Sequence, residues 1–325
     1  MSRSVSPAPT FEGRRHTPYR GRFAPSPTGA LHLGSLVAAV GSYLDARAHQ
    51  GEWWLRIEDV DAPRCSTQAA ADILHTLEAL GFDWDGEVVW QSRRTEAYRA
   101  ALERLEALGL AYPCGCTRKE LAAAAQAEDG SALYPGICRN GLPRGKTARA
   151  WRVRVDEDRI CWDDALQGLR RSELAKDSGD FVVLRADGLF AYQLAVVVDD
   201  AAAGMTHIVR GVDLLASTPR QIHLQHCLGL PTPIYAHLPI VTNAHGEKLS
   251  KQTRAAPLDL RQPQAELFAA LQFLGQSPPA ELQGASLAEL WAWAKANWRR
   301  DRVAVCGERG ASSKLGAMGF ARIAR

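Results

Sequence analysis

The sequence predicts an α/β protein whose core is a doubly wound, mostly parallel sheet. The first observation is that short apolar strands alternate with segments whose apolar residues recur at helical spacing. The second is that helices stand between successive strands, and this order gives parallel pairing with right-handed crossovers. The third is size, because 325 residues, 46% of them apolar, suffice for a full core.

The first half of this domain is expected at residues 19–110. A strand that ends in FAP precedes a helix at 35–49, and WWLRI at 53–57 has the continuous apolar character of a buried strand. Helices are predicted at 67–80 and 95–108, and each is followed by a glycine, which commonly ends a helix. Polar segments follow both strands, at the sheet edge where ligands of such folds bind.

The rest of the chain departs from this rhythm and then returns to it. Residues 111–160 carry cysteines, a basic stretch and the alternating strand WRVRV, which indicates an inserted unit. The α/β pattern resumes over 161–275, with DFVVL, AYQLAVVVDD, THIVRG, TPRQIHLQHCLGL, HLPIV and a late helix. A C-terminal helix is expected within 276–298. Residues 1–18 and 299–325 lack periodicity and are expected to be a disordered extension and a disordered tail.

Composition indicates a soluble, cytoplasmic protein with no membrane segment. Charged residues make up 23% of the chain, and no apolar run approaches the roughly 20 residues of a membrane span. The N-terminus has no apolar stretch typical of a secretory signal. The seven cysteines are therefore expected to be thiols or metal ligands, because disulfides are rare in the cytoplasm.

The net charge of +3 comes from the two ends of the chain. Without residues 1–22 and 299–325, 27 basic and 33 acidic residues remain, so a nucleic-acid contact needs a local patch. Residues 139–155 form one candidate, with six Arg or Lys and no acid. The alternative is a solvated basic hairpin. If the stretch contacts RNA, charge reversal at Arg149 and Arg152 is expected to weaken tRNA binding.

The loop RFAPSPTGALHLGS at residues 22–35 is longer and more rigid than a plain turn requires. A helix opens at Gly34, and the free N–H groups of a helix N-terminus suit a phosphate. His32 can donate to that phosphate, and Gly34 lets a base or ribose approach the backbone. The P-loop and dinucleotide-binding fingerprints are absent. The alternative is a capped turn with a structural histidine.

A second candidate phosphate site is KLSKQ at residues 248–252. Its two lysines, Lys248 and Lys251, can present two ammonium groups to one polyphosphate. Taken alone, the segment is typical of a surface loop.

Together these motifs resemble the two nucleotide-binding motifs of the class I aminoacyl-tRNA synthetases. RFAPSPTGALHLGS is similar to the glutamate-type branch in particular, and so are three later segments. These are RIEDVD at 56–61, FAYQLAVVVDD at 190–200 and HIVRGVDLLASTPRQ at 207–221. The resemblance covers about residues 20–275 and implies a Rossmann-like catalytic domain interrupted by a zinc-binding insertion.

The sequence also departs from an ordinary glutamyl-tRNA synthetase. Only 73 residues follow Gln252, too few for the anticodon-binding domain of that enzyme. Val196 stands in place of Asn, Leu214 in place of Trp, and Ser35 in place of the second His of the first motif. The chain therefore resembles most closely a truncated paralogue family, the glutamyl-Q tRNA(Asp) synthetases. That family activates glutamate and attaches it to the queuosine base in the anticodon of tRNA(Asp).

The resemblance implies roles for individual residues, and the chemistry of the substrates agrees with them. Glutamate needs cations for its two carboxylates and an anion for its ammonium. The implied glutamate residues are Arg22 and Arg210 for the carboxylates, Tyr192 for a hydrogen bond, Glu58 for the ammonium, and Phe23, Ala24, Pro25 and Ser26 as the wall. The implied ATP residues are His32, Gly34, Ser35, Lys248 and Lys251, of which His32, Lys248 and Lys251 are the catalytic ones. The alternative for Arg56-Glu58-Asp59 is a structural ion pair.

A metal site is predicted in the insertion. CGC at 114–116 and YPGIC at 134–138 bring three cysteines near one another, and Zn²⁺ usually takes four ligands. The resemblance implies that structural Zn²⁺ is held by Cys114, Cys116, Tyr134 and Cys138.

The sequence thus predicts an ATP-dependent ligase that works with glutamate, ATP, Mg²⁺ and queuosine-bearing tRNA(Asp), as a monomer in the cytoplasm. Three alternatives remain open. One is a truncated ordinary glutamyl-tRNA synthetase, one is a non-catalytic glutamate or nucleotide sensor, and one is a small-molecule adenylating enzyme of the same superfamily.

Overall fold

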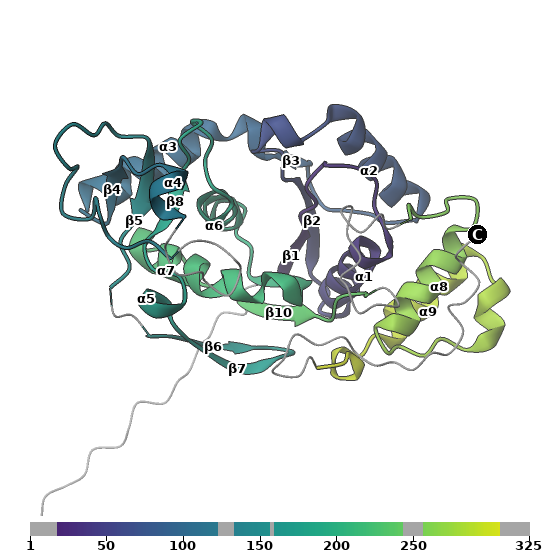
Figure 1. Ribbon diagram of the computed structural model, residues 1–325. Coiled ribbons are helices and arrows are strands. Elements are labelled where there is room, and N and C mark those ends of the chain that lie inside the picture. The colour runs from purple at the N-terminus through teal and green to yellow at the C-terminus, as the bar shows by residue number, and fades with distance from the viewer. Residues whose placement is uncertain (1–17, 123–132, 157–158, 243–255, 306–325) are drawn as a thin grey trace, which may run out of the picture.

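The computed structural model describes residues 18–122, 133–156, 159–242 and 256–305. A parallel sheet runs through the centre of the protein (Figure 1). Its first part has the order β1-β2-β3 and its second part the order β7-β6-β10-β9. The strands of the first part are β1 (Arg20–Phe23), β2 (Glu52–Ile57) and β3 (Val89–Trp90). Those of the second part are β6 (Arg159–Asp164), β7 (Gly168–Glu173), β9 (His207–Gly211) and β10 (Ile234–Leu238).

The two parts meet where β1 lies beside the start of β9. The Thr206 N–H donates to the Arg20 carbonyl at 2.9 Å, and the Arg20 N–H donates to Thr206 Oγ1 at 2.8 Å. Every pair in the sheet is parallel except β6–β7, which is an antiparallel hairpin at one edge. The predicted doubly wound α/β fold is therefore confirmed.

Helices cover both faces of the sheet, as alternating strands and helices require. One apolar core lies beneath α1 (Leu33–Ala48), α2 (Thr67–Ala79), α8 (Pro263–Phe273) and α9 (Leu287–Asn297). A second core lies beneath α3 (Thr95–Ala107), α6 (Tyr192–Ala202) and α7 (Thr218–Leu228). Helix α1 approaches β10 closely, because a Cβ on Gly41 would lie 2.6 Å from a Leu238 methyl carbon. This contact holds the middle of α1 against the sheet.

The inserted unit is a separate antiparallel sheet of β4 (Ala111–Cys114), β5 (Ala150–Val153) and β8 (Phe181–Leu184). The segment DFVVL, expected within the resumed α/β pattern, joins this sheet as β8 instead. It pairs with β5 and alternates buried and half-buried residues, as a strand with one covered face does. Two short helices, α4 (Arg118–Leu121) and α5 (Leu174–Asp177), flank the unit.

The C-terminal segment packs on the domain beyond the point where the sequence predicts a tail. Residues 300–302 form a short 3₁₀ helix, and Val303 is buried. The Arg299 N–H donates to Gln276 Oε1 at 2.9 Å. Residues 299–303 thus pack on the domain, although the lack of periodicity predicted a disordered tail from residue 299 onward. No helix in the described part of the chain is long and apolar enough to cross a bilayer.

Asp45 of α1 holds this C-terminal segment. Its carboxylate accepts hydrogen bonds from Arg300 at 2.6 and 2.8 Å, from Tyr19 at 2.6 Å and from Trp298 at 3.3 Å. Burial raises the pKa of the Asp45 carboxyl, but the hydrogen bonds and charge of Arg300 more than offset this, so the pKa lies below its ordinary value.

Replacing Asp45 by Asn is expected to lower the free energy of unfolding by about 1–3 kcal/mol at pH 7. A carboxyl whose pKa is lowered in the folded state stabilises the fold above its ordinary pKa of 3.8 and loses that effect as the pH falls further. The difference in free energy of unfolding between wild type and variant should therefore be constant down to about pH 5 and become smaller below about pH 4. Urea unfolding at pH 7, 5 and 3.5 measures this, and a gap that persists at pH 3.5 would contradict it.

Candidate active site

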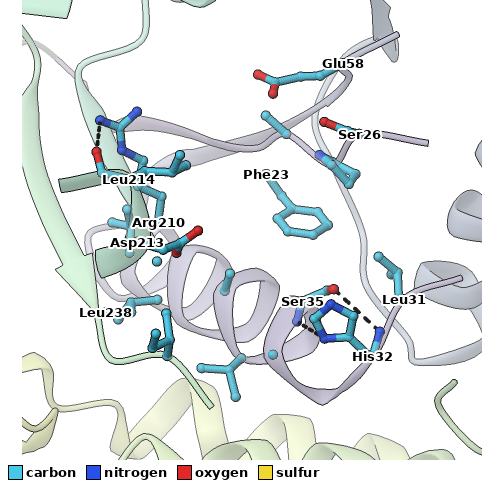
Figure 2. Close-up of a pocket in the computed structure, with 18 of the residues that line it drawn as sticks. Phe23, Ser26, Leu31, His32, Ser35, Glu58, Arg210, Asp213, Leu214 and Leu238 are labelled. Carbon is cyan, nitrogen blue, oxygen red and sulfur yellow. Dashed lines mark hydrogen bonds between the residues drawn. The ribbon is translucent and has the colours of Figure 1, made fainter. Parts of the chain in front are cut away.

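A cavity of about 530 Å³ opens at the carboxyl ends of β1, β2, β9 and β10 (Figure 2). This is the edge at which doubly wound sheets bind ligands. The cavity brings together all eight residues assigned to glutamate, namely Arg22, Phe23, Ala24, Pro25, Ser26, Glu58, Tyr192 and Arg210. It also contains three residues assigned to ATP, which are His32, Gly34 and Ser35. Lys248 and Lys251 lie outside the described residues.

His32 caps the N-terminus of α1 at one side of the cavity (Figure 2). The Ser35 N–H donates to His32 Nδ1 at 3.3 Å, and Ser35 Oγ accepts from the His32 N–H at 3.5 Å. Because Nδ1 accepts a hydrogen bond, the proton of the neutral ring lies on Nε2. Ser35 therefore serves as a helix cap in this structure. The arrangement places an N–H donor and the positive end of a helix dipole at the cavity.

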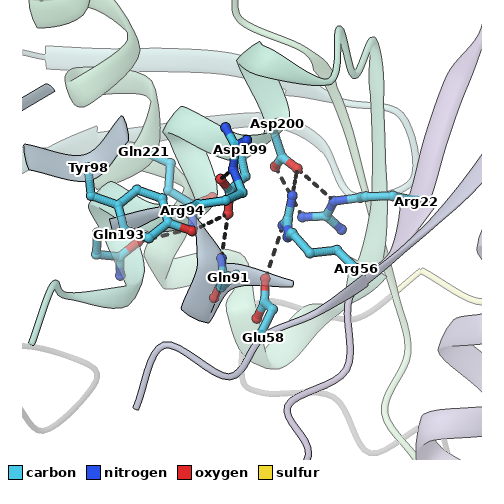
Figure 3. Close-up of polar contacts among 10 residues, drawn as sticks. All are labelled: Arg22, Arg56, Glu58, Gln91, Arg94, Tyr98, Gln193, Asp199, Asp200 and Gln221. Atoms are coloured by element: carbon cyan, nitrogen blue, oxygen red, sulfur yellow. Dashed lines mark hydrogen bonds and ion pairs between the residues drawn. The ribbon is translucent and has the colours of Figure 1, made fainter. Parts of the chain in front are cut away.

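Four charged side chains form a buried cluster beside the cavity (Figure 3). Asp200 accepts from Arg22 at 3.1 and 3.2 Å and from Arg56 at 2.6 Å. Arg56 also donates to Glu58 at 3.0 Å. All four residues are at most 9% exposed, and their two positive and two negative charges balance. The structural ion pair considered for Arg56 and Glu58 is therefore present.

The cluster still leaves groups for a ligand. No hydrogen bond in the described part of the chain uses Arg22 Nη1, and Arg56 contacts only one of the two Glu58 oxygens. Burial raises the pKa of the Glu58 carboxyl, against the lowering effects of Arg56 and Arg22. An arriving ammonium would favour the ionised form of Glu58. The geometry thus allows Arg22 to meet a carboxylate and Glu58 to meet an ammonium.

Arg210 at the end of β9 faces the cavity from the opposite side (Figure 2). Its Nε donates to His237 at 3.1 Å, and Nη2 donates to Thr218 at 2.9 Å. The remaining nitrogen, Nη1, is buried and has no hydrogen-bond partner in the described structure. A buried donor without a partner is costly, and a ligand carboxylate would supply one.

The four predicted metal ligands converge in the inserted unit. The Sγ atoms of Cys114, Cys116 and Cys138 all lie within 4.8 Å of one another. Cys116 Sγ is 3.7 Å from Cys138 Sγ, and Tyr134 Oη is 3.5 Å from the sulfurs of Cys114 and Cys116. Tetrahedral Zn²⁺ with bonds of about 2.3 Å to sulfur and 2.0 Å to oxygen requires separations of about 3.8 and 3.5 Å. The three cysteine sulfurs are thus of a ligand type that zinc prefers, and three of the six separations in the set match those of tetrahedral zinc.

Comparison with known proteins identifies the family. A family model described as tRNA synthetases class I (E and Q), catalytic domain, matches residues 19–283. A protein of Aromatoleum aromaticum named glutamyl-Q tRNA(Asp) synthetase is 66% identical over 86% of this chain and 89% of its own length. A protein of the same name from Dechloromonas aromatica is 60% identical over 89% of this chain and 96% of its own length. The chain belongs to the glutamyl-Q tRNA(Asp) synthetase family.

Solved structures agree with this membership. A glutamate-tRNA synthetase from Elizabethkingia anophelis superposes with a TM-score of 0.72 at 25% identity, over 88% of this chain and 66% of that protein. A glutamate tRNA ligase from Elizabethkingia meningosepticum, solved with its amino acid, has the same score and identity over 91% of this chain and 68% of its own. The chain thus spans about two thirds of the length of each. The resemblance indicated by the ordered motifs is confirmed.

Two positions at which the sequence departs from ordinary glutamyl enzymes have different surroundings. Leu214 lines the cavity, and its carbonyl oxygen lies 3.4 Å from Arg210 Nη2. Val196 is 1% exposed and belongs to the apolar core beneath α6. In this member of the glutamyl-Q tRNA(Asp) synthetase family, neither side chain can donate or accept a hydrogen bond.

Most basic side chains of residues 139–155 form contacts within the domain. Four of its six basic side chains pair with carboxylates or backbone carbonyls, namely Arg139, Lys146, Arg152 and Arg154. Arg152 is 7% exposed, stacks over the Tyr134 ring at 3.9 Å and donates to Cys114 Sγ at 3.4 Å. The expectation that charge reversal at Arg152 probes an RNA surface is therefore wrong, because the change would disrupt the cysteine cluster. Arg144 and Arg149 are exposed.

A second buried network lies behind the charged cluster (Figure 3). Asp199 accepts from Tyr98 at 2.7 Å, from Gln91 at 2.8 Å and from Arg94. These bonds tie α6 to α3 and to the end of β3. Sequence reasoning did not assign Asp199 or Asp200 a role, although two adjacent acids at the end of an apolar helix were a visible signal of buried partners.

Replacing Tyr134 by Phe is expected to lower zinc affinity by at least about 10-fold while the inserted unit stays folded. The phenol oxygen contacts two sulfurs and accepts the Cys138 N–H at 2.7 Å, so its loss would remove a predicted ligand and an acceptor together. The measurement is zinc retained after dialysis against graded chelator. Tyr112→Phe is the matched control, because Tyr112 donates to Asp180 at 2.6 Å and to no sulfur. Equal retention in both variants would contradict the prediction.

Proposed function

We propose that this protein uses ATP to activate glutamate as glutamyl-adenylate and then transfers the glutamyl group to queuosine in the anticodon of tRNA(Asp). The observation that carries the proposal is the unpartnered Nη1 of buried Arg210, which lines the same cavity as Glu58 and the N-terminus of α1. These groups suit a carboxylate, an ammonium and a phosphate. The relatives named glutamyl-Q tRNA(Asp) synthetase support this choice of substrates.

In this reaction a glutamate carboxylate oxygen attacks the α-phosphorus of ATP in line, and the bond to pyrophosphate breaks. A nucleophilic group of the queuosine base then attacks the activated carbonyl and loses its proton, and AMP leaves. The protein supplies no nucleophile, so its contribution is positioning and stabilisation of charge. His32 Nε2 and the first turn of α1 would stabilise charge on the phosphate oxygens. Mg²⁺ bound with ATP would neutralise further phosphate charge.

Replacing Lys251 by Ala is expected to lower the rate of adenylate formation by about 10²–10³-fold, because one donor to the developing phosphate charge is lost. Pyrophosphate exchange measures this rate, and near wild-type exchange would remove Lys251 from the site. Arg261→Ala is a suitable control, since among the described residues this exposed arginine pairs only with Asp259, at 2.7 and 2.8 Å.

We propose that zinc in the inserted unit is structural. The three cysteines and Tyr134 would fill all four positions of a tetrahedral site, which would leave none open for a substrate. We further propose that the enzyme acts as a monomer in the cytoplasm, where its tRNA resides.

The test is glutamate-dependent exchange of pyrophosphate into ATP without tRNA, followed by transfer of labelled glutamate to purified tRNA. The expected result is exchange without tRNA and label on tRNA(Asp) that carries queuosine, with none on tRNA(Asp) lacking it. Label on the 3′ end of tRNA(Glu) would indicate an ordinary synthetase instead. Glutamate binding with no exchange under either condition would indicate a sensor.

A further inference from the structure

A chain of three buried residues leads from the sheet to the cavity. Arg210 of β9 and His237 of β10 are register partners in the parallel sheet, and Arg210 Nε donates to His237 Nε2 at 3.1 Å. His237 Nδ1 lies 2.5 Å from an oxygen of Asp164, at the end of β6. The side chains of His237 and Asp164 are both completely buried.

The hydrogen bonds determine which nitrogen of His237 carries the proton. Arg210 Nε–H can only donate, so His237 Nε2 must be an unprotonated acceptor. Nδ1 then carries the hydrogen and donates to the Asp164 carboxylate. Burial lowers the pKa of His237 to about 4, which keeps the ring neutral at neutral pH. Asp164 is itself held, because its other oxygen accepts backbone N–H groups of Leu166, Gln167 and His237 at 2.9–3.1 Å.

The same contacts determine where the Arg210 guanidinium points. Nε is held by His237, and Nη2 is held by Thr218 Oγ1 at 2.9 Å. Because the guanidinium is planar, fixing two of its nitrogens fixes the third. The third, Nη1, is the buried nitrogen without a partner in the described structure, on a residue that lines the cavity (Figure 2).

We infer that Asp164 and His237 are positioning residues that act through Arg210, holding its guanidinium so that Nη1 meets a carboxylate of the substrate. The inference rests on the proposed function. A purely structural role would require only that the buried polar groups of Asp164 and His237 satisfy each other. It would not require the acceptor nitrogen of His237 to face Arg210, a cavity residue whose remaining donor has no partner in the described structure.

Two substitutions of His237 separate these roles. The amide of Gln reaches the position of Nε2, so His237→Gln keeps an acceptor for Arg210 but loses the donor to Asp164. The amide of Asn reaches only the position of Nδ1, so His237→Asn keeps the donor to Asp164 but loses the acceptor for Arg210. A structural role predicts that KM for glutamate is at least as high in His237→Gln as in His237→Asn. A positioning role predicts that KM for glutamate is higher in His237→Asn.

The measurement is KM for glutamate and KM for ATP in pyrophosphate exchange. We expect His237→Asn to raise KM for glutamate about 10- to 100-fold and His237→Gln to raise it less than about threefold, with KM for ATP unchanged in both. In an Arg210→Met background the two variants should have equal KM for glutamate, since the residue through which His237 acts is gone. His223→Asn is the control for loss of a buried histidine, because His223 bonds the Arg154 carbonyl at 2.8 Å.

The outcomes distinguish the inference from the proposed function. A wild-type chain with no glutamate-dependent exchange, with or without tRNA, would contradict the proposed function. An active wild type whose Asn and Gln variants have equal KM for glutamate would overturn the positioning role alone. If His237→Asn does not fold, Thr218→Val tests the same geometry, because it removes the nearer of the two acceptors of Nη2 and leaves only the Leu214 carbonyl at 3.4 Å. An unchanged KM for glutamate in that variant would also overturn the inference.

Discussion

Replacing Arg210 by Met is expected to lower kcat/KM for glutamate in pyrophosphate exchange by about 10³-fold, as loss of one partner from a buried, charge-assisted contact does. Arg210 is 5% exposed, and its Nη1 has no partner within the described structure. A substrate carboxylate that lost this cation would remain buried without its main counter-charge. KM for ATP should change little, because the α1 N-terminus is untouched.

The fold should tolerate this change, so the loss can be assigned to binding. Thr218 Oγ1 and His237 Nε2 lie 3.3 Å apart and can bond each other when the guanidinium is removed. The neighbouring cluster of Arg22, Arg56, Glu58 and Asp200 is balanced without Arg210. The methionine side chain also keeps the apolar part of the packing against Tyr235. Arg144→Met, at an exposed arginine, is the matched control. A loss of less than 10-fold in Arg210→Met would remove Arg210 from the glutamate site.

Local patterns were enough to predict much of this fold and part of the candidate site. Apolar residues at helical spacing indicated α1 and α2, and the glycines after α2 and α3 marked helix ends with φ near +70°. The cavity residues converge because they follow strands of one parallel sheet, and the carboxyl ends of parallel strands meet at one edge. Their identities came from ordered motifs, which a resemblance to a family can supply.

The residues that support the site could not be predicted in the same way. Arg22 and Asp200 are 178 residues apart, and Asp164 and His237 are 73 apart, so no local spacing connects them. Arg152 was expected on a solvated surface because its neighbours in sequence are basic. It is buried because Tyr134 and Cys114, distant in sequence, supply an aromatic face and a sulfur acceptor. Charge patterns predict exposure only where no such partners exist.

Asp200 connects stability to binding, and its replacement by Ala is expected to lower the free energy of unfolding by about 3–5 kcal/mol. The carboxylate accepts from Arg22 at 3.1 and 3.2 Å and from Arg56 at 2.6 Å, inside a cluster shielded from water. Its removal leaves two buried cations with only Glu58 to balance them. Arg22 also loses both bonds that orient it, so KM for glutamate should rise together with the loss of stability.

Urea unfolding measures the loss of stability in Asp200→Ala. Two further variants show whether the unbalanced charge causes that loss. Asp163→Ala, at an exposed aspartate one residue from the end of β6, should change stability by less than about 0.5 kcal/mol. The double variant Arg56→Met with Asp200→Ala leaves Arg22 and Glu58 as a balanced pair. It should therefore be more stable than Asp200→Ala alone, even though it removes a further residue from the core. A double variant that is less stable than the single one would show that the cluster depends on shape and packing, and not on the balance of its charges.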